Sequence, residues 1–246
     1  MARYSSAPRY DRKLGRWMRR NKLLSLGLLA AIAAGTWFWL QDHPQHNPWA
    51  PLDLRHPVGL ATAKKLIALK DDVPLCRETL TRSDVIYRTL APTGSGACEL
   101  SDRTQLQDYP LAPDTPATTC PVAAALELWR AKTVEPAAQQ IFGSELAAVE
   151  HLGAYSCRRL YGRGEGPWSE HATANAIDIA GFILADGTRI SVLRDWEGDT
   201  DKSRFLRTVR DGACGVFATT LSPEYNAAHA DHFHFDQQTR WAGVCR

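Results

Sequence analysis

The longest uninterrupted apolar segment of the chain runs from Leu23 to Leu40 and contains no charged residue. About twenty apolar residues are needed for a helix to cross a bilayer, so this segment is just long enough to do so. It ends in Trp37-Phe38-Trp39-Leu40, and aromatic side chains of this kind gather at the boundary between lipid and water. The pattern predicts one N-terminal transmembrane helix over residues 23–40.

A basic tail, residues 1–22, precedes this segment and carries eight lysines and arginines against the single acid Asp11. Basic residues are retained on the cytoplasmic side of a membrane, so we expect the N-terminus in the cytoplasm and everything after Leu40 outside it. A cleaved signal peptide is the alternative, because Ala31-Ile32-Ala33 has the small-x-small pattern of a cleavage site. Cleavage there would leave a hydrophobic new N-terminus, which favours an uncleaved anchor.

The distribution of charge excludes one class of partner. The net charge of +2 combines a strongly basic tail with a remainder that carries net negative charge. A domain that binds nucleic acid is usually basic over one face, so we expect no nucleic-acid partner.

Residues 41–57 contain four prolines and little apolar periodicity, and we expect an extended, Pro-rich linker there. Beyond it, residues 58–246 form the exported domain. Helical spacing predicts helices over 62–69, 121–142 and 202–211, with Pro136 breaking or kinking the second.

Strand-like patterns follow at 149–156, 175–182, 188–193, 216–221 and 232–236, and the segment 83–116 has the polar composition of loops and short strands. Ala185-Asp186-Gly187 favours a hairpin turn between the second and third of these strands. Helices beside a sheet of this kind predict an α+β fold, with a mainly antiparallel sheet and flanking helices.

All six cysteines lie after the apolar segment. An even number of cysteines in an oxidising compartment predicts three disulfides, and none of the spacings is that of a structural zinc site. Six cysteines allow fifteen pairings. We expect the sequential one: Cys76 with Cys98, Cys120 with Cys157 and Cys214 with Cys245.

Two short segments carry the chemistry of the chain. The first runs from Ser169-Glu170-His171 to Asp178, and the second is Asp231-His232-Phe233-His234. Asp178 lies between two isoleucines, where a buried carboxylate needs a cation or a hydrogen-bond donor. His232 and His234 are two residues apart, so on a strand both rings leave the same face. Together the segments predict a metal site, with zinc favoured over iron.

A catalytic zinc is typically held by three protein ligands, with water in the fourth position. His171, Asp178 and one of the two strand histidines supply such a set. The reaction also requires a base that takes the proton of the water. His232 and Asp231 are both candidates, and their positions in the sequence do not choose between them.

These residues resemble two known groups. The first is the LAS metallopeptidases, which include lysostaphin-type, D-alanyl-D-alanine and hedgehog-like domains. Their Ser-x-His-x6-Asp signature resembles Ser169-Glu170-His171 with Asp178. Their closing His-x-His resembles His232-Phe233-His234. The run that starts at Tyr155-Ser156-Cys157-Arg158-Arg159 is similar to the bacterial extensin-like C-terminal domain family. Many members have Gly where this chain has Ala174.

The resemblance implies an LAS-type fold with zinc on His171, Asp178 and His234, His232 as the base, and Arg158 holding substrate or the developing oxyanion. It also implies a bacterial protein of the inner membrane with a periplasmic domain that acts on peptidoglycan stem peptides. We expect a D,D-endopeptidase that opens crosslinks. A D,D-carboxypeptidase, a non-catalytic zinc-containing module that binds the cell wall, and an envelope scaffold are the alternatives.

Overall fold

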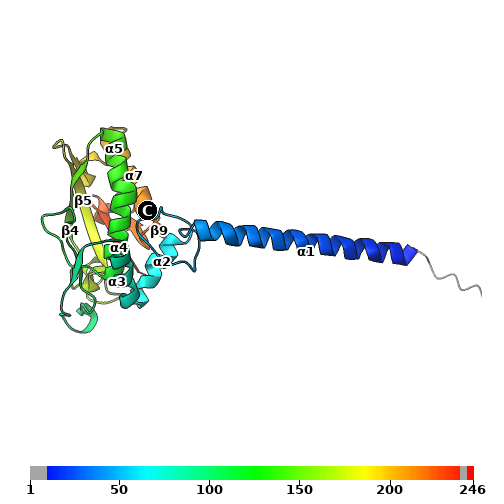
Figure 1. Ribbon diagram of the computed structural model, residues 1–246. Coiled ribbons are helices and arrows are strands. Elements are labelled where there is room, and N and C mark those ends of the chain that lie inside the picture. Colours follow the sequence, from blue (N-terminus) through cyan, green and yellow to red (C-terminus); the bar gives the residue numbers. More distant parts are fainter. Residues whose placement is uncertain (1–9, 239–242) are drawn as a thin grey trace, which may run out of the picture.

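The computed structural model describes residues 10–238 and 243–246 and divides them into one long helix and one α+β domain (Figure 1). Helix α1, Tyr10–Asp42, projects away from the domain. Within it, Asn21–Asp42 is long and apolar enough to cross a membrane, a property that a signal sequence shares. The expected N-terminal apolar helix is therefore confirmed.

Helices and one mixed sheet form the two layers of the domain. The remaining α-helices are α2 Thr62–Ala68, α3 Val73–Arg82, α4 Cys120–Trp129, α5 Glu135–Phe142, α6 Val192–Asp195 and α7 Asp201–Ala213. The strands are β1 Tyr87–Thr89, β2 Thr104–Leu106, β3 Leu111–Ala112, β4 Leu146–Gly153, β5 Ala176–Leu184, β6 Arg189–Ser191, β7 Thr219–Leu221, β8 Phe233–Asp236 and β9 Val244–Cys245. Figure 1 shows α4, α5 and α7 together on one side of β4 and β5.

The main sheet has the strand order β3-β4-β5-β8-β7-β9, with β6 also paired to β5. Strand β3 runs parallel to β4, and β9 runs parallel to β7, whereas the central pairs are antiparallel. The expectation of a mainly antiparallel sheet is therefore wrong in detail, because the two short outer strands make the sheet mixed. Neither outer strand has an apolar pattern long enough to predict it.

Trp129 of α4 lies at the centre of the core and is fully buried. Its ring packs against Phe182 of β5 and Phe235 of β8, and its indole N–H donates to the carbonyl of Val209 in α7 at 2.8 Å. One side chain of α4 thus contacts two strands of the sheet and α7. The helices pack on this face of the sheet, and the candidate site lies on the other.

The helix predicted over 121–142 is one continuous helical segment with an irregular centre. A π-helical turn, Arg130–Val134, joins α4 to α5, and Pro136 follows in the first turn of α5. Proline has no N–H to donate to the preceding turn, and its ring needs space there, so a wider turn accommodates it. The regular α-helix is therefore interrupted just before Pro136, where the sequence predicted a break or a kink.

Residues 41–57 do not form the expected extended linker. They fold into turns that pack on the domain: Leu54 is buried in the core, and its N–H donates to Ser83 Oγ at 2.9 Å. Lys132 Nζ donates to the carbonyl of Arg55 at 2.5 Å. The prolines end the helix and shape these turns without keeping the chain extended.

The structure forms three disulfides, but only one pairing is as expected. Cys214–Cys245 is confirmed, whereas the other two are Cys76–Cys120 and Cys98–Cys157. The sequential expectation failed because α3, which no pattern predicted, places Cys76 beside the first residue of α4. Cys98 is then left to tie the loop after β1 to the segment that carries Arg158.

The Cys76–Cys120 bond gives a direct test of this pairing. In the single variant Cys76→Ser, thiol alkylation should find Cys120 as the free cysteine; finding Cys98 would restore the sequential pairing. Because the bond spans 44 residues, the double variant Cys76→Ser/Cys120→Ser should be less stable by about 4 kcal/mol. Thermal unfolding of the full chain should show a Tm lower by on the order of 10 °C.

Candidate metal centre

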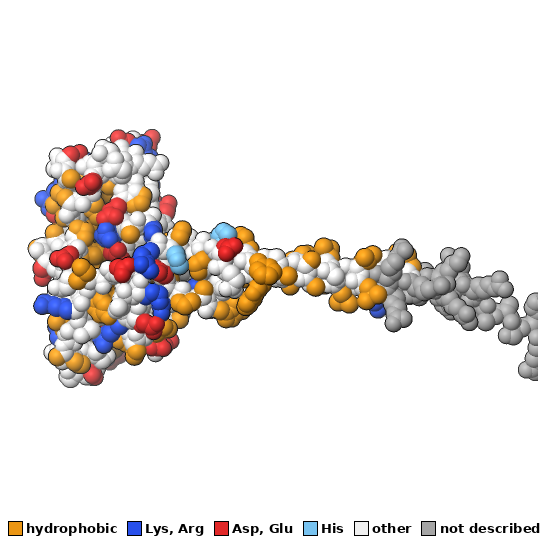
Figure 2. Space-filling model, in the orientation of Figure 1, with side chains coloured by type: hydrophobic (Ala, Val, Ile, Leu, Met, Phe, Trp, Pro, Cys, Tyr) orange, Lys and Arg blue, Asp and Glu red, His pale blue; other side chains and the backbone are white. Residues whose placement is uncertain are grey.

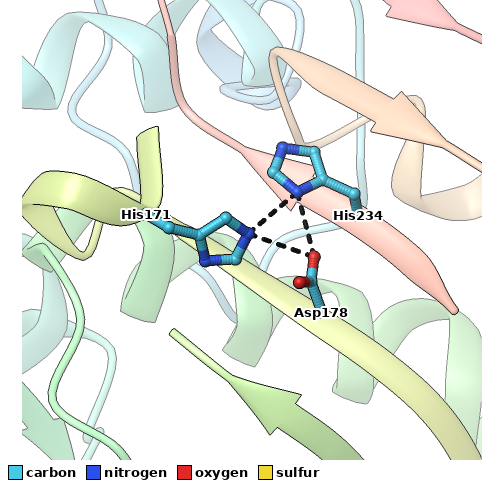
Figure 3. A group of neighbouring side chains, drawn as sticks. All are labelled: His171, Asp178 and His234. Carbon is cyan, nitrogen blue, oxygen red and sulfur yellow. Dashed lines mark hydrogen bonds and ion pairs between the residues drawn. The ribbon is translucent and has the colours of Figure 1, made fainter. Parts of the chain in front are cut away.

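The side chains of His171, Asp178 and His234 point toward one another from different elements of the fold (Figure 3). His171 Nε2 lies 3.2 Å from Asp178 Oδ1 and 3.1 Å from His234 Nδ1, and His234 Nδ1 lies 2.9 Å from Asp178 Oδ1. These three residues were predicted to converge, and the structure brings them together as one group of possible metal ligands.

Two of the three come from paired strands. Asp178 of β5 stands directly opposite His234 of β8 in the antiparallel register. Ile177 and Ile179 on either side of Asp178 are fully buried, so alternation along the strand places the carboxylate on the opposite face, away from the helices. The same alternation of Phe233 and Phe235 places His234 beside it.

His171 reaches the site from a short 3-10 turn, Glu170–Thr173. Ser169 caps the turn: its Oγ accepts the N–H of His171 at 3.3 Å. Ala174 ends the turn with a φ of 53°, in the left-handed region that favours glycine. A residue with a side chain adopts this conformation at some conformational cost.

Outer partners orient both histidines. His171 Nδ1 donates to the carbonyl of Ala154 at 3.0 Å, and His234 Nε2 donates to Asp236 Oδ2 at 3.0 Å. In neutral rings the lone pairs of His171 Nε2 and His234 Nδ1 therefore face the carboxylate of Asp178. Three acceptors in mutual contact repel one another unless a proton or a metal cation lies among them.

The pKa shifts have the same cause. Burial alone would raise the pKa of Asp178, but the bonds from His171 and His234 outweigh it and hold that pKa well below its usual range. Burial lowers the pKa of His234, but the carboxylates of Asp178 and Asp236 raise it to about 9. The site therefore stabilises positive charge beside an ionised carboxylate.

The donor set fits zinc. Two imidazole nitrogens and one carboxylate oxygen are typical ligands of a catalytic zinc, and tetrahedral ligands about 2.0–2.1 Å from the ion lie about 3.3 Å from one another. The three observed separations, 2.9 to 3.2 Å, are close to that value. Second partners that fix the ligand tautomers, as Ala154 and Asp236 do here, are usual at such centres.

The two candidate bases take different positions. His232 Nε2 lies 3.6 Å from Asp178 Oδ1, at the edge of the ligand group. His232 Nδ1 contacts Asp231 Oδ1 at 2.7 Å, and the Asp231 side chain is 54% exposed. Asp231 thus lies behind His232 and orients its ring, whereas His232 faces the site.

A cavity of about 140 Å³ opens over the group, and Arg158, His171, Asp178, His229, His232 and His234 all help to line it. Arg158 is exposed there and forms no ion pair with any other described residue. An adjoining cavity of about 180 Å³ is lined by the aromatic residues Tyr161, Trp168 and Tyr225. Among the described residues, Arg158 is the only lysine or arginine that lines either cavity.

Sequence reasoning missed two residues of this site. Asp236 follows His234 by two positions on the same strand, and that spacing was a signal that could have found it. His229 comes from the 3-10 turn Ala227–His229, and its ring lies 5.3 Å from that of His232. Its pKa is lowered to about 4, first by burial and then by the neighbouring rings of His234 and His232. No spacing in the sequence indicated it.

Residues 74–246, which include every candidate site residue, match the family described as Extensin-like protein C-terminus. The chain belongs to the extensin-like C-terminus family. Searches of curated proteins and of solved structures found no match. For this family member, the side-chain geometry is therefore the main guide to the chemistry.

The metal centre can be tested by metal analysis of the purified full-length protein. We expect about one zinc per chain, and none in Asp178→Ala, which removes the shared carboxylate. Asp236→Asn should bind zinc 10- to 100-fold more weakly, because His234 loses its charged partner. Asp231→Asn is the matched control, since its carboxylate contacts no ligand, and its zinc affinity should not change. Full zinc retention in Asp178→Ala would contradict the assigned ligand set.

Proposed function

We propose that this extensin-like protein is a zinc-dependent peptidase with an LAS-type active site, which hydrolyses the stem peptides of peptidoglycan as a D,D-endopeptidase. The observation that carries the proposal is the convergence of His171, Asp178 and His234 in a cavity that also presents a paired His232–Asp231 and the exposed Arg158. Metal-dependent amide hydrolysis requires these parts: ligands for the metal, a base that takes the proton of the water, and a positive charge that binds the substrate.

Zinc held by the three ligands would polarise the scissile carbonyl and lower the pKa of a bound water to about 7. The remaining steps fall to residues of the chain. His232 Nε2 accepts the proton of the attacking water and delivers it to the departing amine nitrogen, while hydroxide adds to the acyl carbon and the C–N bond breaks. Asp231 holds the ring in the tautomer that leaves Nε2 free, as the 2.7 Å contact at Nδ1 supports.

Arg158 lines the same cavity and supplies a positive charge for the substrate carbonyl oxygen or a nearby carboxylate. The adjoining aromatic cavity supports an endopeptidase, because His234 lines both cavities and the second one offers space for a further residue of the peptide.

The location of the protein is part of the proposal. The apolar helix Asn21–Asp42 follows the basic tail, and three disulfides stabilise the domain beyond it. Together they support an inner-membrane anchor with a cytoplasmic N-terminus and a periplasmic domain. That compartment contains the proposed substrate.

Purified full-length protein incubated with crosslinked muropeptides tests the proposed activity. We expect loss of crosslinked dimers, inhibition by a zinc chelator and recovery on adding zinc. His232→Gln should keep its zinc but lose activity by about 10²- to 10⁴-fold, because the proton transfer is lost. His56→Gln, a histidine outside both cavities, is the control and should retain full activity.

Other outcomes of the same assay separate the alternatives. Loss of only a terminal D-alanine would replace the endopeptidase by a carboxypeptidase. A protein that binds zinc and muropeptides but leaves both bonds intact would be the non-catalytic module.

A further inference from the structure

Three apolar side chains near the end of α1 are unusually exposed. Trp49 is 78%, Leu60 87% and Val58 39% exposed. Figure 2 shows hydrophobic side chains gathered where the helix meets the domain. Exposed apolar side chains that lie close together on a folded domain commonly mark a surface that contacts a partner or a membrane. We call Trp49, Val58 and Leu60 the junction patch.

Asn47 connects one side of this patch to the end of α1. Its side chain is buried, and Nδ2 donates to the carbonyl of Leu40 at 3.4 Å, while Oδ1 accepts the N–H of Trp49 at 3.0 Å. The bond satisfies a carbonyl that the end of a helix leaves without a partner. The side chain of Asn47 thereby links the backbone of Trp49 to the last turns of the apolar helix.

A second set of bonds connects the other side of the patch. The N–H groups of Leu60 and Ala61 donate to His46 Nδ1 at 3.2 Å and to the carbonyl of Gln45 at 3.1 Å. Lys65 of α2 donates to the carbonyl of Pro44 at 2.9 Å. The ring of Trp39, inside the apolar helix, stacks on those of His43 and His46, at 4.4 and 5.2 Å. The ring of His46 therefore links the backbone of Leu60 to Trp39.

Gly59 makes this close approach possible. A Cβ at this position would lie 2.6 Å from the carbonyl oxygen of Gln45, closer than real Cβ contacts. The chain thus uses a glycine where the domain and the end of α1 meet. We call these contacts between residues 44–46 and residues 59–65 the packed joint. They fix the domain against the end of α1, which a flexible linker would not do.

We propose that the junction patch inserts into the interfacial layer of the bilayer that α1 crosses, so that the domain rests on the membrane surface in one orientation. The inference rests on α1 being a membrane span and is independent of the proposed peptidase activity. A lipid surface is favoured as the occupant because the patch is continuous with the span through Asn47 and His46. Tryptophan also suits the boundary between lipid and water.

Site-directed spin labelling of the full chain tests the proposal. A nitroxide is attached through an encoded p-acetylphenylalanine, so that the six cysteines stay intact, and the protein is reconstituted alone in phosphatidylethanolamine–phosphatidylglycerol nanodiscs. Labels at Trp49 and Leu60 should collide severalfold more often with oxygen, which concentrates in lipid, than with a water-soluble nickel chelate. A label at Leu152, equally apolar and 60% exposed on β4, should show the reverse, because β4 lies on the side of the domain away from α1 (Figure 1).

A label at Ile32, within α1, reports the span itself. Lipid contact at Ile32 with water contact at Trp49 and Leu60 would overturn the docking but leave the anchor standing. Water contact at Ile32 would overturn both. Neither result bears on muropeptide cleavage, so failure of the docking and failure of the peptidase proposal remain distinguishable.

The variant Gly59→Ala tests the joint. Its added Cβ should separate Leu60 from the end of α1, so the label at Leu60 should lose most of its preference for oxygen. Gly164→Ala is the matched control, because a Cβ there meets no atom within 4 Å and the label should keep its depth. An unchanged depth in Gly59→Ala would contradict the packed joint.

Discussion

Strands β5 and β8 are paired in the register that sets Asp178 opposite His234, and the candidate metal centre depends on that pairing. A slip of one residue would turn Asp178 into the core and move both Ile177 and Ile179 out of it. Those isoleucines, with Phe233 and Phe235 on β8, are fully buried against Trp129 and its neighbours. The hydrophobic packing of one face of the sheet therefore holds two polar candidate ligands, Asp178 and His234, in place on the other face. His171 is positioned separately, by its capped turn.

Electrostatic interactions and hydrogen bonds add to this packing in holding the three candidate ligands. Asp178 is ionised although largely buried, and each histidine is held by an acceptor behind it, Ala154 for His171 and Asp236 for His234. Bringing three acceptor atoms together around one point costs electrostatic free energy, because they repel one another. Binding a cation among them offsets that cost. His232 has Asp231 behind it at Nδ1 and faces the cavity with Nε2, which lies 3.6 Å from Asp178 Oδ1. The fold thus supplies both the ligands and the base of the proposed peptidase.

The strands that carry ligands were predictable because their apolar residues alternate, as at 175–182 and 232–236, and because the His-x-His and His-x6-Asp spacings specify chemistry. Long-range features were not predictable. Helix α3 has no distinctive periodicity, and without it the pairing of Cys76 could not be inferred. His229 enters the site through a short turn between strands, which depends on how the loop closes. The prolines of 41–57 predicted an extended linker, which was wrong, because the buried positions of Asn47 and Leu54 depend on contacts with distant residues.

The proposed packed joint between α1 and the domain would hold the peptidase site at a fixed height above the bilayer. In the proposed peptidase, His171, Asp178 and His234 share one zinc ion. Anomalous diffraction at the zinc absorption edge, from crystals of the zinc-loaded protein, tests it most directly. We expect one strong peak about 2.0–2.2 Å from His171 Nε2, Asp178 Oδ1 and His234 Nδ1. A peak at other side chains, with none among these three, would contradict it.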